Sequence, residues 1–146
     1  PEVVFVTFPC TGLNFLCPGF ERAVRATGVR GRIVSPDERE DRVGTLTLLA
    51  RQGYALVVVD AGWSDELAIV APRFPEARFA ALDVPLRFIE GRPRNVEAAL
   101  ADPHEALEEF LAVTLGARSV RQQGRANHRT SEVVLSENAV GVWSNL

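Results

Sequence analysis

The sequence predicts an α/β fold: a three-layer α/β/α sandwich on a mainly parallel sheet of five or six strands. Short apolar runs alternate with segments of helical periodicity over the first 117 residues, which is typical of parallel sheets with helices on both faces. Residues 55–59 are apolar at every position, as expected of a strand covered on both sides. The 146 residues, 47% of them hydrophobic, suffice for one core.

The first half of the chain is expected to contain three strands and two helices. Residues 3–8 are all β-branched or aromatic and are followed by Pro9, which predicts a buried strand. Pro18 suits the first turn of a helix that Gly28 ends. Residues 31–34 predict the second strand. Residues 37–52 follow as a helix with one apolar side, and residues 55–59 as the third strand.

The second half continues the alternation. Ser64 is expected to cap a helix that ends near Pro72, and residues 78–82 and 95–101 predict two further strands. Asp102 as cap and Pro103 as first residue begin a helix that Gly116 is expected to close. Residues 118–130 are polar and predicted as a loop, and residues 132–135 as a last strand. Residues 1–117 are thus expected to form the lobe, with residues 118–146 as a crossing segment and final strand packed on it.

Composition and motifs argue against several classes of function. The chain has 16 basic and 19 acidic residues and a net charge of −3, so nucleic acid is not an expected partner. Two cysteines and two distant histidines give a metal site little to build on, so no metal is expected. The glycine-rich dinucleotide and phosphate motifs and the G-x-S-x-G nucleophile motif are absent, and neither a cofactor nor an enzymatic activity is expected.

The two cysteines lie seven positions apart in the loop that follows the first expected strand. Cys10 and Cys17 lack the C-x-x-C spacing of redox motifs, and Cys17 has apolar neighbours. Buried free thiols are the favoured interpretation, a local disulfide is the second, and redox catalysis is the remainder.

The candidate ligand site lies at the carboxyl ends of the expected strands. Ligands of open α/β sheets bind at that edge. Asp60 and Asp83 each follow a strand there, and Trp63 offers a flat apolar face with one donor. Each residue alone is more often structural, because aspartates cap helices and tryptophans fill cores. Their convergence on one edge favours a binding site.

Residues 53–63, 70–83 and 94–96 carry a family resemblance. The first segment, GYALVVVDAGW, resembles an "EGYDLI" segment before a strand ending in glycine and an aromatic. The second ends in FPEARFAALD, which resembles "FPD-x-KFA-x-ID", and the third, RNV, resembles "PNV". These blocks occur in this order in the basic membrane protein family of substrate-binding lipoproteins, which includes purine-nucleoside receptors of ABC importers. The resemblance runs from about residue 3 to residue 117.

The resemblance implies one lobe of a type I periplasmic-binding-protein fold and a set of ligand contacts. Phe15 matches the family's stacking phenylalanine and Asp83 its strand-end aspartate, and Asn14 lies beside Phe15 in the same stretch. The family's acidic pair and its Asn-Gln pair are replaced by residues 11–12 and 16–17, TG and LC. The resemblance therefore implies a less polar ligand than a nucleoside, or none.

Two functional hypotheses follow. The first is a non-catalytic solute-binding module of nucleoside type for an ABC importer, or a truncated relative of one, with Phe15, Asn14, Asp60, Trp63 and Asp83 as ligand contacts. Its partners would be a small solute and either membrane subunits or a second lobe, a homodimer included, in an extracytoplasmic location. The alternative is a regulatory or interaction domain that uses an apolar crest formed by Leu13, Phe15, Leu16 and Trp63. An enzyme with Asp60 or Asp83 as acid or base ranks third.

Overall fold

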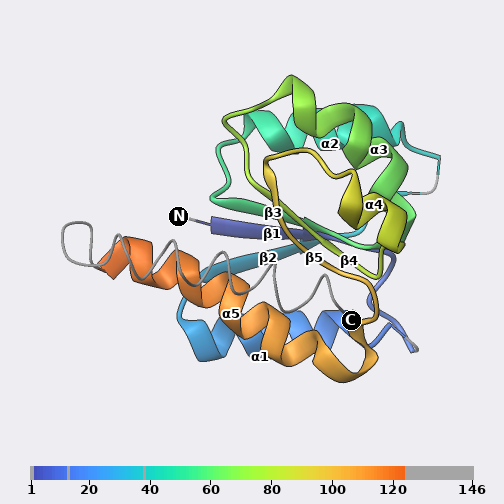
Figure 1. The fold of residues 1–146 in the computed structure, drawn as a ribbon. Helices are drawn as coiled ribbons and strands as arrows, with labels where there is room; N and C mark the ends of the chain where they lie inside the picture. The colour runs from blue at the N-terminus through green and yellow to red at the C-terminus, as the bar shows by residue number, and fades with distance from the viewer. Residues whose placement is uncertain (1, 13, 38, 124–146) are drawn as a thin grey trace.

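A computed structural model describes residues 2–12, 14–37 and 39–123. Five parallel strands form one sheet in the order β2-β1-β3-β4-β5 (Figure 1). The strands are β1 (Glu2–Val6), β2 (Arg30–Val34), β3 (Leu56–Val59), β4 (Phe79–Leu82) and β5 (Val96–Leu100). The predicted three-layer sandwich with a parallel sheet is confirmed.

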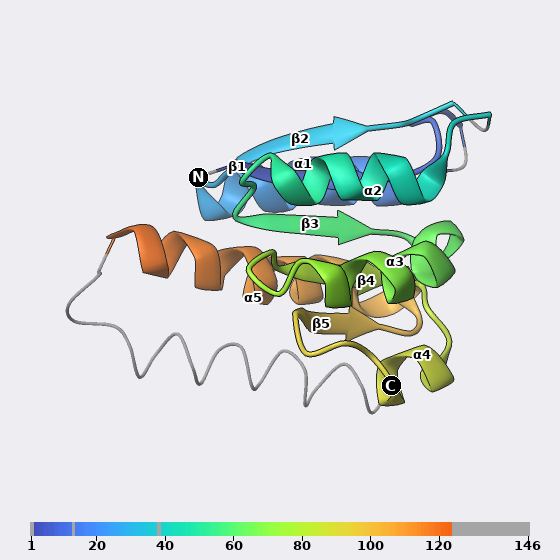
Figure 2. The same ribbon diagram turned by 90° about the horizontal axis from the view of Figure 1, so that it is seen from above.

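Helices cover both faces of the sheet (Figures 1 and 2). One face carries α1 (Leu16–Thr27) and α5 (Pro103–Gln123). The other carries α2 (Arg42–Arg51), α3 (Ser64–Val70) and α4 (Leu86–Glu90). Two short 3-10 turns, η1 (Ala61–Trp63) and η2 (Ala71–Arg73), flank α3.

Alternation along each strand divides the core into two apolar layers. In β1, Val3 and Phe5 pack toward α1 and α5, whereas Val4 and Val6 pack toward α2 and α3. The Phe5 ring lies 5.2 Å from that of Phe20 on α1, measured between centroids. Because successive side chains of a strand point to opposite faces, a wholly apolar strand is stable only between two helical layers.

The outer strand β2 differs from the inner ones. Arg30, Gly31 and Arg32 are exposed, and β2 pairs only with β1 among the described strands. A Cβ atom on Gly31 would lie 2.4 Å from a methyl group of Val24 on α1, so this strand needs glycine to let the helix approach.

Two helices begin at other residues than expected, and one helix was not predicted. Helix α2 begins at Arg42 and not at Asp37, because the Asp37 carboxylate accepts a hydrogen bond from the Arg39 amide and turns the chain first. Ser64 is the first residue of α3 and not its cap; Asp60 instead caps η1 by accepting from the Gly62 amide. The helix α4 was not predicted.

The last helix also extends beyond its expected end. Helix α5 passes through Gly116 and continues to Gln123, so part of the predicted loop at residues 118–130 is helical. Leu115 and Ala117 are both buried, and their burial outweighs the roughly 1 kcal/mol that a glycine costs inside a helix. The predicted strand at residues 132–135 and Trp143 lie outside the described residues, as does most of the predicted crossing segment.

Candidate functional site

The sheet order creates a crevice between β1 and β3. The chain leaves β1 for α1 on one face and leaves β3 for η1 and α3 on the other face. Two neighbouring strands whose connections diverge in this way leave a space at their carboxyl ends, which is where ligands of such sheets bind. The expected location of the site is therefore present in the fold.

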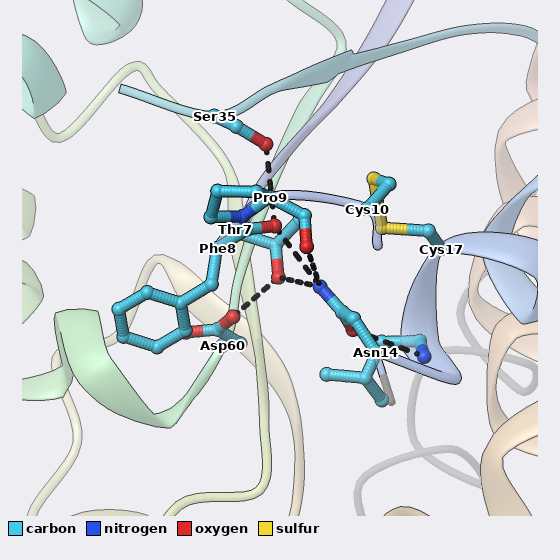
Figure 3. Close-up of a disulfide and its surroundings, with 9 residues drawn as sticks. Thr7, Phe8, Pro9, Cys10, Asn14, Cys17, Ser35 and Asp60 are labelled. Atoms are coloured by element: carbon cyan, nitrogen blue, oxygen red, sulfur yellow. Dashed lines mark hydrogen bonds between the residues drawn. A yellow bond between two sulfur atoms is a disulfide. The ribbon is translucent and has the colours of Figure 1, made fainter. Parts of the chain in front are cut away.

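A hydrogen-bond network joins the two walls of this crevice (Figure 3). Thr7 lies just after β1 and Asp60 just after β3. The Thr7 hydroxyl donates its hydrogen to Asp60 Oδ2, with the two oxygen atoms 2.5 Å apart. Asp60 Oδ1 accepts from the Gly62 amide at 3.1 Å. Thr7 and Asp60 are both buried. The Asp60 carboxylate thus has two protein donors and holds β1 and β3 together.

Asn14 extends the network into the cysteine loop. Its amide donates to Thr7 Oγ1 at 3.3 Å and to the Phe8 carbonyl at 3.0 Å, and Asn14 Oδ1 accepts from the Leu16 amide at 3.2 Å. Asn14 therefore fixes the loop to the end of β1 and satisfies an amide at the start of α1, where helical partners are lacking. Asn14 and Asp60, both predicted as ligand contacts, therefore have a structural role.

The cysteine loop is closed by a disulfide. Cys10 and Cys17 are bonded to each other, with their Cα atoms 5.7 Å apart (Figure 3). The favoured prediction of two buried free thiols is wrong: Cys17 is buried, but Cys10 is exposed and both sulfur atoms are used. The start of α1 brings Cys17 back over the loop, which the seven-residue spacing alone did not reveal.

Trp63 lines the crevice and also belongs to the hydrophobic core. Its side chain is only 3% exposed and packs with the layer beneath α2 and α3. Its indole Nε1 has no hydrogen-bond partner among the described residues. Leu16 is buried as well, so two of the four residues of the apolar crest expected for an interaction domain are in the core, and Leu13 lies outside the described residues.

Phe15 and Asp83 lie in a different part of the edge, beside the start of α5. The Phe15 ring stacks on the His104 imidazole with centroids 4.9 Å apart and an interplanar angle of 20°. Phe15 remains 39% exposed. Asp83 follows β4 and interacts electrostatically with His104, Asp102 and Asp60. One face of the predicted stacking ring is thus occupied by a neighbour in the chain.

A cleft of about 720 Å³ opens over the ends of β1 and β2. It contains Thr7 and Trp63 but neither Phe15 nor Asp83, so the five predicted residues do not line one pocket. Its lining residues are Thr7, Phe8, Pro9, Ser35, Pro36, Asp37, Arg39, Arg42 and Trp63. Sequence reasoning missed Phe8 and Arg42; the only signal for Phe8 was its place at the end of the first strand.

A second hollow, of about 590 Å³, lies at the opposite, amino edge of the sheet. Its buried polar residue is Asn95, whose amide donates to the carbonyl oxygens of Ala71, Phe74 and Ala77 at 2.9, 2.9 and 3.1 Å. That amide is fully used in holding the chain between α3 and β4, so this edge is built for stability. The carboxyl edge is the better candidate for binding.

Asp83 combines an unusual backbone with a perturbed carboxyl group. Its φ of 56° lies in the left-handed region, which asparagine, aspartate and glycine tolerate best. Partial burial raises the pKa of Asp83; the nearby Asp102 and Asp60 carboxylates raise it further, and His104 opposes them. A raised folded-state pKa means that this group's contribution to stability is complete below its unfolded pKa and is lost as the pH rises through the folded pKa.

We expect Asp83→Asn to be more stable than the parent at pH 7 and to lose that advantage below about pH 4, where the aspartate is protonated. Asparagine keeps the left-handed backbone, whereas Asp83→Ala should be destabilised by about 1 kcal/mol through strain. Thermal unfolding of the three proteins between pH 3 and pH 8 tests both effects. A difference between Asp83→Asn and the parent that does not change with pH would contradict the electrostatic explanation.

Comparisons with known proteins support the fold. Neither a protein-family model nor a curated protein matches the chain. Among solved structures, the chain is similar to a fragment described as a "putative lipoprotein from Peptoclostridium difficile 630", with a TM-score of 0.63 and 16% sequence identity. The likeness covers 84% of this chain and 98% of that one. At this identity the likeness shows a shared fold.

Two features are absent from the described ranges. None of the helices in the described ranges combines the length and apolar character needed to cross a membrane. Within the same ranges, no three histidine, cysteine or acidic side chains gather in a way that could hold a metal ion.

Proposed function

We propose that this domain is a non-catalytic solute-binding module whose ligand, of the nucleoside class, occupies the cleft over β1 and β2. The observation that carries the proposal is the position of that cleft beside the β1–β3 crevice, where open α/β sheets bind ligands. It combines an exposed ring, Phe8 at 42%, with polar groups from Ser35 and the start of α2. An apolar surface with a few polar groups is typical of small-molecule sites.

The chemistry of the described residues favours binding over catalysis. The cysteines are joined in the disulfide, and the Ser35 hydroxyl donates to the Phe8 carbonyl at 3.2 Å instead of to a base. His104 is stacked on Phe15, outside the cleft lining. A nucleophile next to a general base, which acyl or glycosyl transfer would need, is therefore not found in the described part of the chain.

The resemblance to substrate-binding lipoproteins supplies the finer proposal of an importer component outside the cytoplasm. The Cys10–Cys17 disulfide favours that location, because disulfides persist in oxidising compartments. Since the cleft lies at the edge of one lobe, a second lobe or a membrane subunit would be the partner that encloses the solute.

Thermal unfolding with purine and pyrimidine nucleosides tests the proposal. A nucleoside present at 100 times its dissociation constant should stabilise the fold by about 2.7 kcal/mol, because only the folded state binds it. Phe8→Ala should abolish the rise in midpoint, and Ile69→Ala, which removes an exposed side chain on α3, should retain it. No rise with any nucleoside would refute the nucleoside proposal, and a rise unaffected by Phe8→Ala would place the ligand outside this cleft.

A further inference from the structure

Arg42 places a cation inside the cleft. It is the first residue of α2, and its guanidinium donates to the Gly62 carbonyl of η1. The same group lies over two aromatic rings, 5.1 Å from the centroid of Trp63 and 5.8 Å from that of Phe8. Arg42 is half-buried. The side chain is therefore held in a fixed place between aromatic surfaces, as guanidinium groups in binding sites commonly are.

This cation has no acidic partner in the described part of the chain. The ion pair found there joins Arg22 to Glu108 on α1 and α5, which cover the other face of the sheet from α2. Asp37 lines the cleft, but it accepts from the Arg39 amide and forms no ion pair with Arg42. With Arg39 also in the lining, the described residues of the cleft include two guanidinium groups and one carboxylate. A partly desolvated charge without a counter-charge is unfavourable, and a bound anion would relieve it.

Among its described residues, the cleft has hydrogen-bond donors that lack a protein partner. Arg42 uses one terminal nitrogen for the Gly62 carbonyl, and its remaining N–H groups have no partner among the described residues. The Thr7 and Ser35 hydroxyl hydrogens are already donated to Asp60 and to the Phe8 carbonyl. Trp63 Nε1 also lacks a protein partner in the described ranges, but it is buried and is not counted as a donor for a ligand. A ligand group that accepts hydrogen bonds would complement the free N–H groups of Arg42.

We infer that the solute carries an anionic group, a carboxylate or a phosphate monoester, which binds the Arg42 guanidinium. This inference rests on the proposed function, because it places the solute in the same cleft. The planar fork of arginine matches the oxygen atoms of either anion in a bidentate arrangement. Phe8, which is 42% exposed, then provides apolar surface beside the anion for a planar part of the solute.

Matched pairs of small molecules test the inference. The first pair is adenosine 5′-monophosphate and adenosine, and the second is benzoate and benzamide; each pair differs mainly in charge. The sequence contains two tryptophans, Trp63 and Trp143. In a Trp143→Phe variant only Trp63 is left, so tryptophan fluorescence reports binding at the cleft. We expect at least one anion to bind tenfold or more tightly than its neutral partner, and the more effective pair distinguishes phosphate from carboxylate.

Arg42→Gln removes the charge and should abolish the preference within the pair. Arg51→Gln is the matched control: Arg51 ends the same helix and lies 5.8 Å from the ring centroid of Phe74, outside the cleft. It should leave the preference unchanged. Arg42→Lys keeps the charge and should retain part of the preference, which separates a loss of charge from a loss of packing. A melting curve for each variant establishes that it is folded.

The outcomes separate the inference from the proposed function. If adenosine and its monophosphate bind equally well and benzoate no better than benzamide, the anion inference is wrong and the proposed function stands. If the anions bind through Arg42 and nucleosides do not bind, the inference stands and the nucleoside proposal fails. If none of the four molecules binds to the folded protein and no nucleoside of the thermal-unfolding panel stabilises it, both are wrong.

Discussion

Replacing Thr7 with valine is expected to lower the free energy of unfolding by about 2 kcal/mol, because the hydroxyl bonded to Asp60 is lost at nearly constant side-chain volume. Hydrogen bonds to charged groups contribute more than neutral ones, and the Asp60 carboxylate is only 3% exposed, so water cannot replace the missing donor. Asn14 also loses an acceptor, which should loosen the cysteine loop. Urea unfolding of parent and variant measures the change.

Two further substitutions make the Thr7 result specific. Thr47→Val is the same chemical change on α2, where the hydroxyl donates to the Val43 carbonyl within the helix; it should change stability by less than about 0.5 kcal/mol. Thr7→Ser keeps the hydroxyl and should recover most of the loss. Equal effects of Thr7→Val and Thr47→Val would mean that the bond to Asp60 does not hold β1 and β3 together.

Removing the disulfide is expected to cost about 2–3 kcal/mol, the value that chain entropy gives for a loop of this length. The double variant Cys10→Ser/Cys17→Ala suits the environment of each residue, since Cys10 is exposed and Cys17 is buried. Unfolding is measured with and without a phosphine reductant. The parent should lose stability on reduction and approach the double variant, which the reductant should not affect.

The assignment of a Cys10–Cys17 disulfide would be wrong if thiol labelling found two free cysteines in the parent before reduction and the urea midpoint did not change on reduction. The disulfide variant also bears on binding. Asn14 lies inside the loop and bonds to the Phe8 carbonyl. Opening the loop should therefore lower the affinity for a ligand that contacts Phe8 more strongly than it lowers the stability of the fold.

The fold could be predicted because its strands are short, apolar and separated by helices with one apolar side. Residues 55–59 show this best: each side chain in β3 is buried in one of the two layers, so the sequence needs no polar alternation. Helix α4 has only five residues, too few to show a period, and α5 continues through Gly116 because packing outweighs local propensity.

The candidate site could be predicted only as a location. The end of β3 was predicted correctly and that of β1 two residues too late, but Asp60 and Asn14 are used in the framework, and Phe15 and Asp83 lie outside the cleft. Arg42 had no distinguishing signal, since an arginine at the start of a helix resembles any solvated charge. Its importance comes from the proximity of α2 to η1, a contact between residues 20 positions apart.

The exposed arginines of β2 also affect how copies of this domain behave toward one another. A strand at the edge of a sheet offers unpaired backbone groups on which a strand from a second molecule can add, and repeated addition leads to aggregation. Arg30 and Arg32 flank the single exposed glycine of this edge. An incoming strand from an identical molecule would bring its own arginines against them, and the repulsion between like charges disfavours that pairing. The same residues that make β2 the least apolar strand of the described sheet therefore disfavour polymerisation along this strand.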